Sequence, residues 1–265
     1  MRENRVKRIM REGGLALGVM VGNIADPQIV EIIGHAGFDA AFIDLEHTSL
    51  DLRDVQAMVM AAELAGITPI ARTPGFDPAF ILRLLDIGVQ GIQVPHVNDA
   101  KAAREAVKAV RYPPLGDRGI GGAGRVSEFG KISMKEHMEQ SNREILLSVM
   151  IEELSALDEI DAIAATEGVD LIVVGPSDMS HALGVTGQTD HPRLVETMNR
   201  VADAVRKSGV TRFQMQMNHP VFPRNAAQLR ELGVAYSNCA PTPEVRLLRS
   251  LQAQMAEARK ALGAA

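Results

Sequence analysis

The chain has 265 residues, of which 46% are hydrophobic and 23% charged, a composition typical of a globular protein with one large domain or two small ones. Its 33 acidic and 28 basic residues give a formal net charge of −5, which argues against nucleic-acid binding because that depends on clustered Lys and Arg. The single cysteine, Cys239, excludes an intramolecular disulfide and a zinc site built on several thiolates.

The beginning of the chain and its hydropathy predict a cytoplasmic protein. Residues 1–8 mix charges and lead into no apolar segment of signal-peptide length. No run of about 18 consecutive apolar residues occurs, so we expect no membrane span.

Short apolar runs recur along the whole chain and alternate with segments of helical periodicity. The predicted strands are Leu15–Met20, Ala40–Leu45, Thr68–Ala71, Gly91–Pro95, Ile145–Ile151, Leu171–Val174, Phe213–Met217 and Val234–Cys239. The predicted helices include Asp51–Ala65, Pro78–Asp86, Asp99–Val110, Glu153–Thr166, Pro192–Lys207 and Pro220–Leu232. This alternation is typical of βαβ units and a parallel sheet.

Eight such strands predict an α/β fold, a single (β/α)₈ TIM barrel over residues 1–265. A doubly wound open sheet is the alternative, but no G-x-G-x-x-G follows the first strand. The last predicted helix, Pro243–Leu262, is long and alanine-rich. We expect it to extend beyond the barrel, and it is a candidate for exchange with a neighbouring subunit.

Residues 112–125 contain five glycines and form the longest predicted non-helical stretch. Long ordered loops in compact domains are usually lids or binding loops. We therefore expect this loop to be functional.

The chemistry of a barrel lies at the carboxyl ends of its strands. The second predicted strand ends at Asp44, Glu46 and His47, and period-2 alternation places the two carboxylates on one face. A carboxylate can orient an imidazole and tune its basicity. The alternative is that the acidic residues only cap or salt-bridge the rim.

Arg72 ends the third predicted strand and precedes Thr73-Pro74, a position suited to holding a substrate carboxylate with two hydrogen bonds. Pairing with Asp44 or Glu46 is the alternative for its guanidinium.

The fifth and sixth predicted strands lead into Glu152 and Asp178. Two carboxylates on adjacent strands suit a hard divalent cation whose remaining ligands are water and substrate oxygens. Alternatively, either is a helix N-terminal acid, and Ser177 with Asp178 caps the helix that follows, whose free amides would face an anionic ligand.

The remaining candidates are interpreted as structural. His35 and His96 suit rim or core positions better than metal ligation, and Cys239 suits a buried thiol. No lysine ends a predicted strand, so a Schiff-base aldolase would lack its nucleophile.

The segment Gly37-Phe38-Asp39-Ala40-Ala41-Phe42-Ile43-Asp44-Leu45-Glu46-His47 resembles the GFDxxxIDxEH signature of the metal-dependent class II pyruvate aldolases. These include the 4-hydroxy-2-oxoheptanedioate and 2-dehydro-3-deoxyglucarate aldolases. The resemblance runs from about residue 13 to 184 and continues, in the expected order, at residues 71–74, 84–88, 94–97, 111–119, 151–152 and 174–180.

The resemblance implies reversible aldol cleavage of a 4-hydroxy-2-keto acid to pyruvate, or a close 2-keto acid, and an aldehyde. It implies that Glu152 and Asp178 bind a divalent ion, Mg²⁺ or Mn²⁺ and alternatively Co²⁺ or Zn²⁺. It further implies that Arg72 contacts the keto acid, and that His47 with Asp44 is the acid/base pair.

The expected substrate contacts also include Pro176 and Ser177, and Arg118 on the glycine-rich lid would reach the far end of the aldehyde. The family resemblance implies a homohexamer, a trimer of dimers, in which Asp86 completes a neighbouring subunit's site. The chain departs from the family at Met150, where a glutamine is usual.

Two other functions stay open at this stage. A lyase acting on CoA thioesters, as in the related citrate and malyl-CoA lyases, needs a basic groove for the CoA phosphates, and the sequence shows no obvious one. A non-catalytic keto-acid-binding barrel is consistent with Met150.

Overall fold

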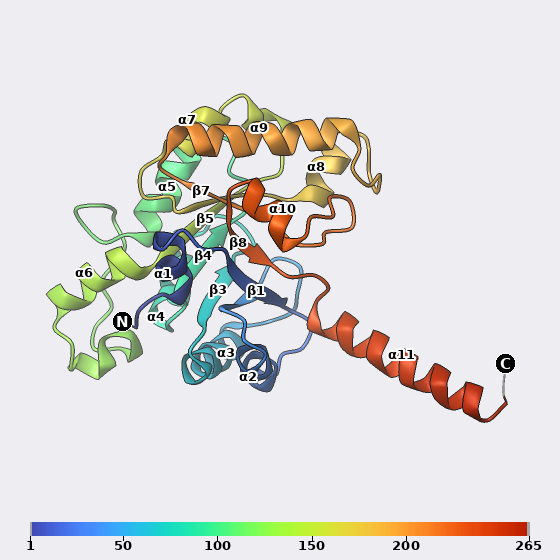
Figure 1. Ribbon diagram of the computed structural model, residues 1–265. Coiled ribbons are helices and arrows are strands. Elements are labelled where there is room, and N and C mark those ends of the chain that lie inside the picture. Colours follow the sequence, from blue (N-terminus) through green and yellow to red (C-terminus); the bar gives the residue numbers. More distant parts are fainter. Residues whose placement is uncertain (1, 264–265) are drawn as a thin grey trace.

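The computed structural model describes residues 2–263, which form a closed barrel of eight parallel strands surrounded by helices (Figure 1). The predicted (β/α)₈ fold is confirmed. The strands are β1 (Ala16–Val21), β2 (Ala40–Asp44), β3 (Thr68–Arg72), β4 (Gly91–Val94), β5 (Leu146–Ile151), β6 (Leu171–Val174), β7 (Arg212–Gln214) and β8 (Val234–Asn238).

Helices lie between the strands and at both ends of the chain. They are α1 (Arg5–Arg11), α2 (Pro27–His35), α3 (Leu52–Ala65), α4 (Pro78–Asp86), α5 (Ala100–Val110), α6 (Met134–Glu144), α7 (Ile160–Ala164), α8 (Pro176–Ala182), α9 (Pro192–Ser208), α10 (Ala226–Glu231) and α11 (Pro243–Ala261). Two 3₁₀ helices, η1 (Arg125–Gly130) and η2 (Leu154–Leu157), complete the set. Among these residues, no helix combines the length and the apolar character needed to cross a bilayer.

The amino end of the barrel is closed by α1. Val6 is fully buried with residues at the beginnings of the strands, among them Ala16 and Leu146. Asn4 donates two hydrogen bonds, to the carbonyls of Gln90 and Glu144. Because this end is filled, the carboxyl ends of the strands are left as the open mouth.

Two predicted helices are shorter than expected. The segment Glu153–Thr166 is divided into η2 and α7, which begins only at Ile160. The predicted helix Pro220–Leu232 begins only at Ala226, where Asn225 provides the N-terminal cap with Gln228. Most other boundaries differ from the prediction by one or two residues.

The C-terminal helix α11 projects away from the barrel (Figure 1). None of its described residues is buried, and its large apolar side chains Leu247, Leu248, Leu251 and Met255 are each more than half exposed. The prediction that this helix extends beyond the barrel is confirmed. Such a stripe of exposed leucines is unusual for a helix that has no partner.

Candidate active site

The register of β2 and β3 places Asp44 directly beside Arg72 at the barrel mouth. Arg72 donates from Nε to Asp44 Oδ1 at 2.8 Å and from Nη2 to Asp44 Oδ2 at 2.7 Å. Its third nitrogen, Nη1, lies 2.9 Å from Glu46 Oε2. Both Arg72 and Asp44 are buried, so this two-point pair holds the guanidinium plane in one orientation.

The same contacts keep the guanidinium of Arg72 protonated. Burial alone would lower the pKa of its guanidinium, but the hydrogen bonds and charge of Asp44, with the charges of Glu46 and Glu152, raise it overall. Arg72 is therefore a fixed, fully charged donor beside the mouth.

This pairing changes the predicted acid/base arrangement. Both oxygens of Asp44 accept hydrogen bonds from Arg72, and Oδ1 also accepts the backbone N–H of Glu46. The ring of His47 lies nearest Glu46, with Nε2 3.7 Å from Oε2, and its side chain is 70% exposed. The prediction that Asp44 orients His47 is wrong: Asp44 positions Arg72 instead.

Glu152 directly follows β5, Asp178 lies in the first turn of the helix after β6, and both adjoin Gly175. A Cβ atom built on Gly175 would lie 3.0 Å from Asp178 Oδ2 and 3.6 Å from Glu152 Cγ. Met150 Cε is also 3.0 Å away, so glycine at this position leaves a small space bounded by Asp178, Glu152 and Met150 that any side chain would fill.

Negative charge accumulates in this space. Burial raises the pKa of Glu152, and the neighbouring carboxylates Glu46 and Asp178 raise it further, while the backbone N–H and charge of His96 act in the opposite direction. One oxygen of Glu46, Oε2, is buried and accepts no hydrogen bond from any described residue, although Arg72 is close. Three carboxylates in one place favour a bound cation.

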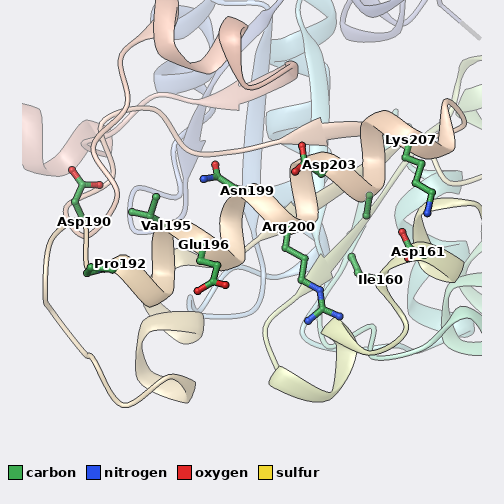
Figure 2. Close-up of a pocket in the computed structure, with 11 residues that line it drawn as sticks. Ile160, Asp161, Asp190, Pro192, Val195, Glu196, Asn199, Arg200, Asp203 and Lys207 are labelled. Carbon is green, nitrogen blue, oxygen red and sulfur yellow. The ribbon is translucent and has the colours of Figure 1, made fainter.

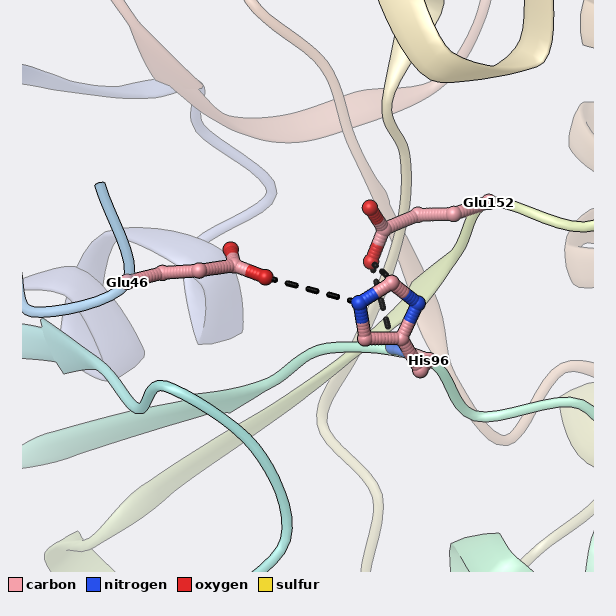
Figure 3. Close-up of side chains that lie close together, drawn as sticks. All are labelled: Glu46, His96 and Glu152. Carbon is pink, nitrogen blue, oxygen red and sulfur yellow. Dashed lines mark hydrogen bonds and ion pairs between the residues drawn. The ribbon is translucent and has the colours of Figure 1, made fainter.

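His96, interpreted from the sequence as structural, lies in the same place (Figure 3). Its Nε2 is 3.5 Å from Glu46 Oε1, and its Nδ1 is 3.8 Å from Glu152 Oε1. Its backbone N–H donates to the same Glu152 oxygen at 3.1 Å. Among residues 2–263, Glu46, His96 and Glu152 form a group whose ligand atoms all lie within 4.8 Å of one another.

The helix α8 begins on this rim, but not with the predicted cap. Gly175 is its N-cap residue, no side chain caps it, and Ser177 and Asp178 lie inside its first turn. The hydroxyl of Ser177 instead contacts His219 Nε2 at 3.3 Å. His219 is buried and its Nδ1 accepts the Val221 N–H, so Nε2 carries the proton that faces Ser177.

A cavity of about 50 Å³ forms the floor of the mouth. Arg72, Met150 and Pro176 line it, and its other walls include the amides Gln93 and Gln214. The thioether of Met150 lies 3.5 Å from Gln93 Nε2 and 4.0 Å from Arg72 Nη1. Met150 thus occupies the space beside Arg72 with a weak acceptor.

Arg118 and Asp86 lie elsewhere. Asp86 ends α4, which leads into β4, so it lies at the amino end of the barrel, opposite the mouth. Arg118 is completely buried there, with Nη2 2.9 Å from Asp86 Oδ1 and a further hydrogen bond to Ser141. Its guanidinium also stacks on Tyr112 at 4.5 Å. The prediction that Arg118 acts as a lid over its own chain's substrate is wrong.

The structure instead predicts that Arg118 supports the fold. Replacing it with Ala should lower the free energy of unfolding by about 2–3 kcal/mol, because Asp86 loses its ion pair, Ser141 its hydrogen bond and Tyr112 its stacked guanidinium. Urea denaturation measures this loss, with the exposed Arg230→Ala as control. Wild-type stability in Arg118→Ala would contradict the assignment.

Two further features do not belong to the mouth. An open groove of about 880 Å³ runs along α9, where Arg200 and Lys207 extend toward Ile160 and Asp161 on the outside of the barrel (Figure 2). Cys239 is buried as predicted, and burial raises the pKa of its thiol to about 11, so it is not an activated nucleophile.

The sequence pattern of the HpcH/HpaI aldolase/citrate lyase family matches residues 19–241, which include every rim residue described above. The chain belongs to this family. The family membership predicted from the motifs is therefore confirmed, and the protein is a carbon–carbon lyase of the HpcH/HpaI type.

Individual relatives share most of their length with this HpcH/HpaI family member. A hydroxypyruvate/pyruvate aldolase of Roseobacter denitrificans is 38% identical over 212 residues, 78% of this chain and 82% of the relative. A 5-keto-4-deoxy-D-glucarate aldolase of Escherichia coli O157:H7 is 38% identical over 186 residues, 70% and 72% of the two chains. The crystal structure of an HpcH/HpaI aldolase from Desulfitobacterium hafniense superposes with a TM-score of 0.82 at 32% identity, over 97% and 95% of the two chains.

Proposed function

We propose that this protein reversibly cleaves a 4-hydroxy-2-keto acid to pyruvate, or a close 2-keto acid, and an aldehyde, with the help of a divalent cation. The proposal rests on the arrangement at the mouth of a barrel that belongs to an aldolase family. Asp44 fixes Arg72 beside Glu46, and Glu152 and Asp178 both adjoin Gly175 on the same rim. The relatives named as pyruvate and keto-deoxy-glucarate aldolases support the same chemistry.

The residues of the mouth fit a divalent cation. Gly175 leaves room between Glu152 and Asp178, and the mutual repulsion of these carboxylates with Glu46 is relieved by positive charge. We propose that Glu152 and Asp178 hold Mg²⁺, Mn²⁺, Co²⁺ or Zn²⁺. When bound, such an ion supplies a Lewis acid that stabilises the enolate of the keto acid.

Arg72 would stabilise negative charge on the keto acid as the carbon–carbon bond breaks. Its Nε and Nη2 are committed to Asp44, while Nη1 pairs with Glu46 at 2.9 Å, and Arg72 lines the cavity. A donor held in place beforehand lowers the barrier because it does not reorganise during the reaction. We therefore propose that Asp44 acts by positioning Arg72 and does not itself contact the substrate.

Pro176 and Ser177 would hold the keto acid from the side of β6. Pro176 lines the cavity, and the Ser177 oxygen faces the Nε2–H of His219. A hydroxyl that accepts from His219 has its own hydrogen free for a substrate oxygen.

His47 would take the proton from the aldol hydroxyl. Its side chain is 70% exposed, and Nε2 lies 3.7 Å from Glu46 Oε2, beyond hydrogen-bond distance, so the ring is available for proton transfer. We expect His47→Ala to lower the rate of aldol cleavage by about 10²–10⁴-fold, the usual contribution of a general base. Deuterium uptake into the methyl group of pyruvate should survive, because it requires only enolisation. Equal loss of both activities would instead make His47 the enolising base.

We also propose a homo-oligomer, a hexamer built as a trimer of dimers, in which α11 packs on a neighbouring subunit and Asp86 reaches a neighbour's mouth. The apolar stripe of α11 supports this assembly, since each of Leu247, Leu248, Leu251 and Met255 is more than half exposed.

The assembly is tested by Leu251→Glu, which puts a charge on the apolar stripe of α11. Light scattering should report a smaller particle than for the wild type, while Ala253→Glu, on the opposite side of the helix, should keep the full mass. A wild-type protein that is monomeric, or a Leu251→Glu protein of unchanged mass, would contradict the proposal.

Metal removal and restoration test the function itself. Chelated protein is assayed for pyruvate release from a panel of 4-hydroxy-2-keto acids that differ in their aldehyde portion. We expect no turnover without metal and restored turnover with at least one of the four cations. Pyruvate release from no member of the panel would favour a keto-acid-binding barrel, and cleavage of CoA thioesters alone would favour the other lyase.

A further inference from the structure

The surroundings of His96 do not match the structural role that its sequence context suggested. It follows β4 at the mouth and adopts a left-handed backbone conformation, with φ 55°, that directs its ring between two carboxylates. Left-handed conformations are uncommon for residues other than glycine. The ring makes no hydrogen bond to any described residue: its contacts with Glu46, Glu152 and Glu153 are all between 3.5 and 3.8 Å.

These separations suit ligands of one cation better than hydrogen-bond partners. Nitrogen and oxygen ligands about 2.1 Å from a shared cation lie roughly 3.0–3.4 Å from their neighbours, in octahedral or tetrahedral arrangements. The ligand atoms of Glu46, His96 and Glu152 lie within 4.8 Å of one another, so small side-chain movements bring them to such distances.

The second ring nitrogen is also placed as in a metal-bound histidine. With Nε2 toward Glu46 and the cation, Nδ1 keeps its hydrogen and lies 3.8 Å from both Glu152 Oε1 and Glu153 Oε1. A carboxylate beside the non-ligating nitrogen of an imidazole is the usual partner that fixes its orientation.

We infer that His96 supplies a nitrogen ligand to the cation held by Glu152, and that it makes this site prefer a transition-metal ion over Mg²⁺. The inference rests on the proposed function for the presence of a cation at Glu152. Its chemical basis is that Mg²⁺ binds almost only oxygen ligands and keeps several waters, whereas imidazole is a good ligand for Co²⁺ and Zn²⁺.

The test measures metal binding directly, so it needs no substrate. Chelated protein is titrated calorimetrically with Mg²⁺, Mn²⁺, Co²⁺ and Zn²⁺ in the wild type, His96→Asn and His96→Ala. His96→Asn is included because asparagine tolerates the left-handed backbone. His96→Ala is included because alanine has no side-chain amide that binds the metal in place of the imidazole. His35→Ala, at the amino end of the barrel, is the matched control.

In both His96 variants we expect Co²⁺ and Zn²⁺ to bind at least about 10-fold more weakly. Removing a hydrogen-bond partner of a metal ligand already weakens binding by about this factor, and removing a direct ligand should weaken it no less. Mg²⁺ affinity should change by less than about 2-fold, and the visible spectrum of bound Co²⁺ should change because a nitrogen ligand is lost. Unchanged Co²⁺ affinity and spectrum would overturn the inference. Equal losses for Mg²⁺ and Co²⁺ would also overturn it, because a nitrogen ligand must discriminate between them.

A parallel titration of Glu152→Gln separates this inference from the proposed function. If Glu152→Gln loses all four cations while the His96 variants bind normally, the inference fails and the proposed metal site stands. If Glu152→Gln binds all four as the wild type does, the proposed metal site itself is wrong.

Discussion

Replacing Glu152 with Gln is expected to lower metal-dependent pyruvate release on the order of 10³-fold or more. The variant keeps the size of the side chain but removes a negative charge from the pair that adjoins Gly175. A Lewis acid contributes several kcal/mol to catalysis, and each 1.36 kcal/mol corresponds to a tenfold change in rate.

The assay is pyruvate release at saturating metal, with Glu159→Gln as control. Glu159 is exposed on the same βα connection and has no ion pair with a described residue. Near-full activity of Glu152→Gln, at saturating metal or when the metal is reduced to trace levels in the same assay, would remove Glu152 from the metal site. Asp178→Asn should reproduce the loss, because it alters the other half of the pair.

Arg72→Lys is expected to lower turnover by about 10²–10³-fold, the usual effect of deleting one charged or hydrogen-bonding donor to a developing oxyanion. Lysine keeps the positive charge but has one nitrogen where Arg72 uses two for Asp44 and directs a third toward Glu46 and the cavity. A single ammonium group cannot pair with Asp44 and face the substrate in the same way.

Steady-state kinetics together with urea denaturation check this prediction. The fall should appear in kcat while folding stays cooperative, because the buried Asp44 keeps a cationic partner. Arg53→Lys, on the exposed side of α3, is the control and should behave as wild type. Wild-type kinetics in Arg72→Lys would assign Arg72 to structure.

Much of the mouth could be predicted from the sequence because strand ends follow a simple rule. In a parallel barrel every carboxyl end lies on the same rim, so Asp44, Arg72, Glu152 and Asp178 had to come together once the strands were recognised. The alternation of apolar and polar residues was sufficient to find those strands.

The sequence left Asp44 with two possible partners, His47 and Arg72, because the choice depends on register and on loop direction. The residue beside Asp44 is Arg72 on the next strand, whereas His47 lies beyond the end of β2, where the chain bends and period-2 alternation no longer holds. The ion pair between Asp44 on β2 and Arg72 on β3 therefore determined which side chain Asp44 contacts. The same strand-end rule, applied after β4, would have included His96, but its left-handed backbone could not be read from Val94-Pro95-His96.

Arg118 was misplaced for a different reason. Glycine content predicted a loop but not its location in the barrel. The loop follows α5, and a segment that follows a helix lies at the amino end of the strands, away from the mouth. Chain order alone contained that information.

Deuterium exchange into the methyl group of pyruvate tests the central claim most directly, because it reports enolate formation without knowledge of the aldehyde. Chelated protein is incubated with pyruvate in D₂O and followed by proton NMR, with and without added Mn²⁺. We expect exchange only in the presence of the cation, and loss of exchange in both Glu152→Gln and Arg72→Lys. Exchange that proceeds without metal, or that persists at the wild-type rate in Glu152→Gln, would contradict the claim.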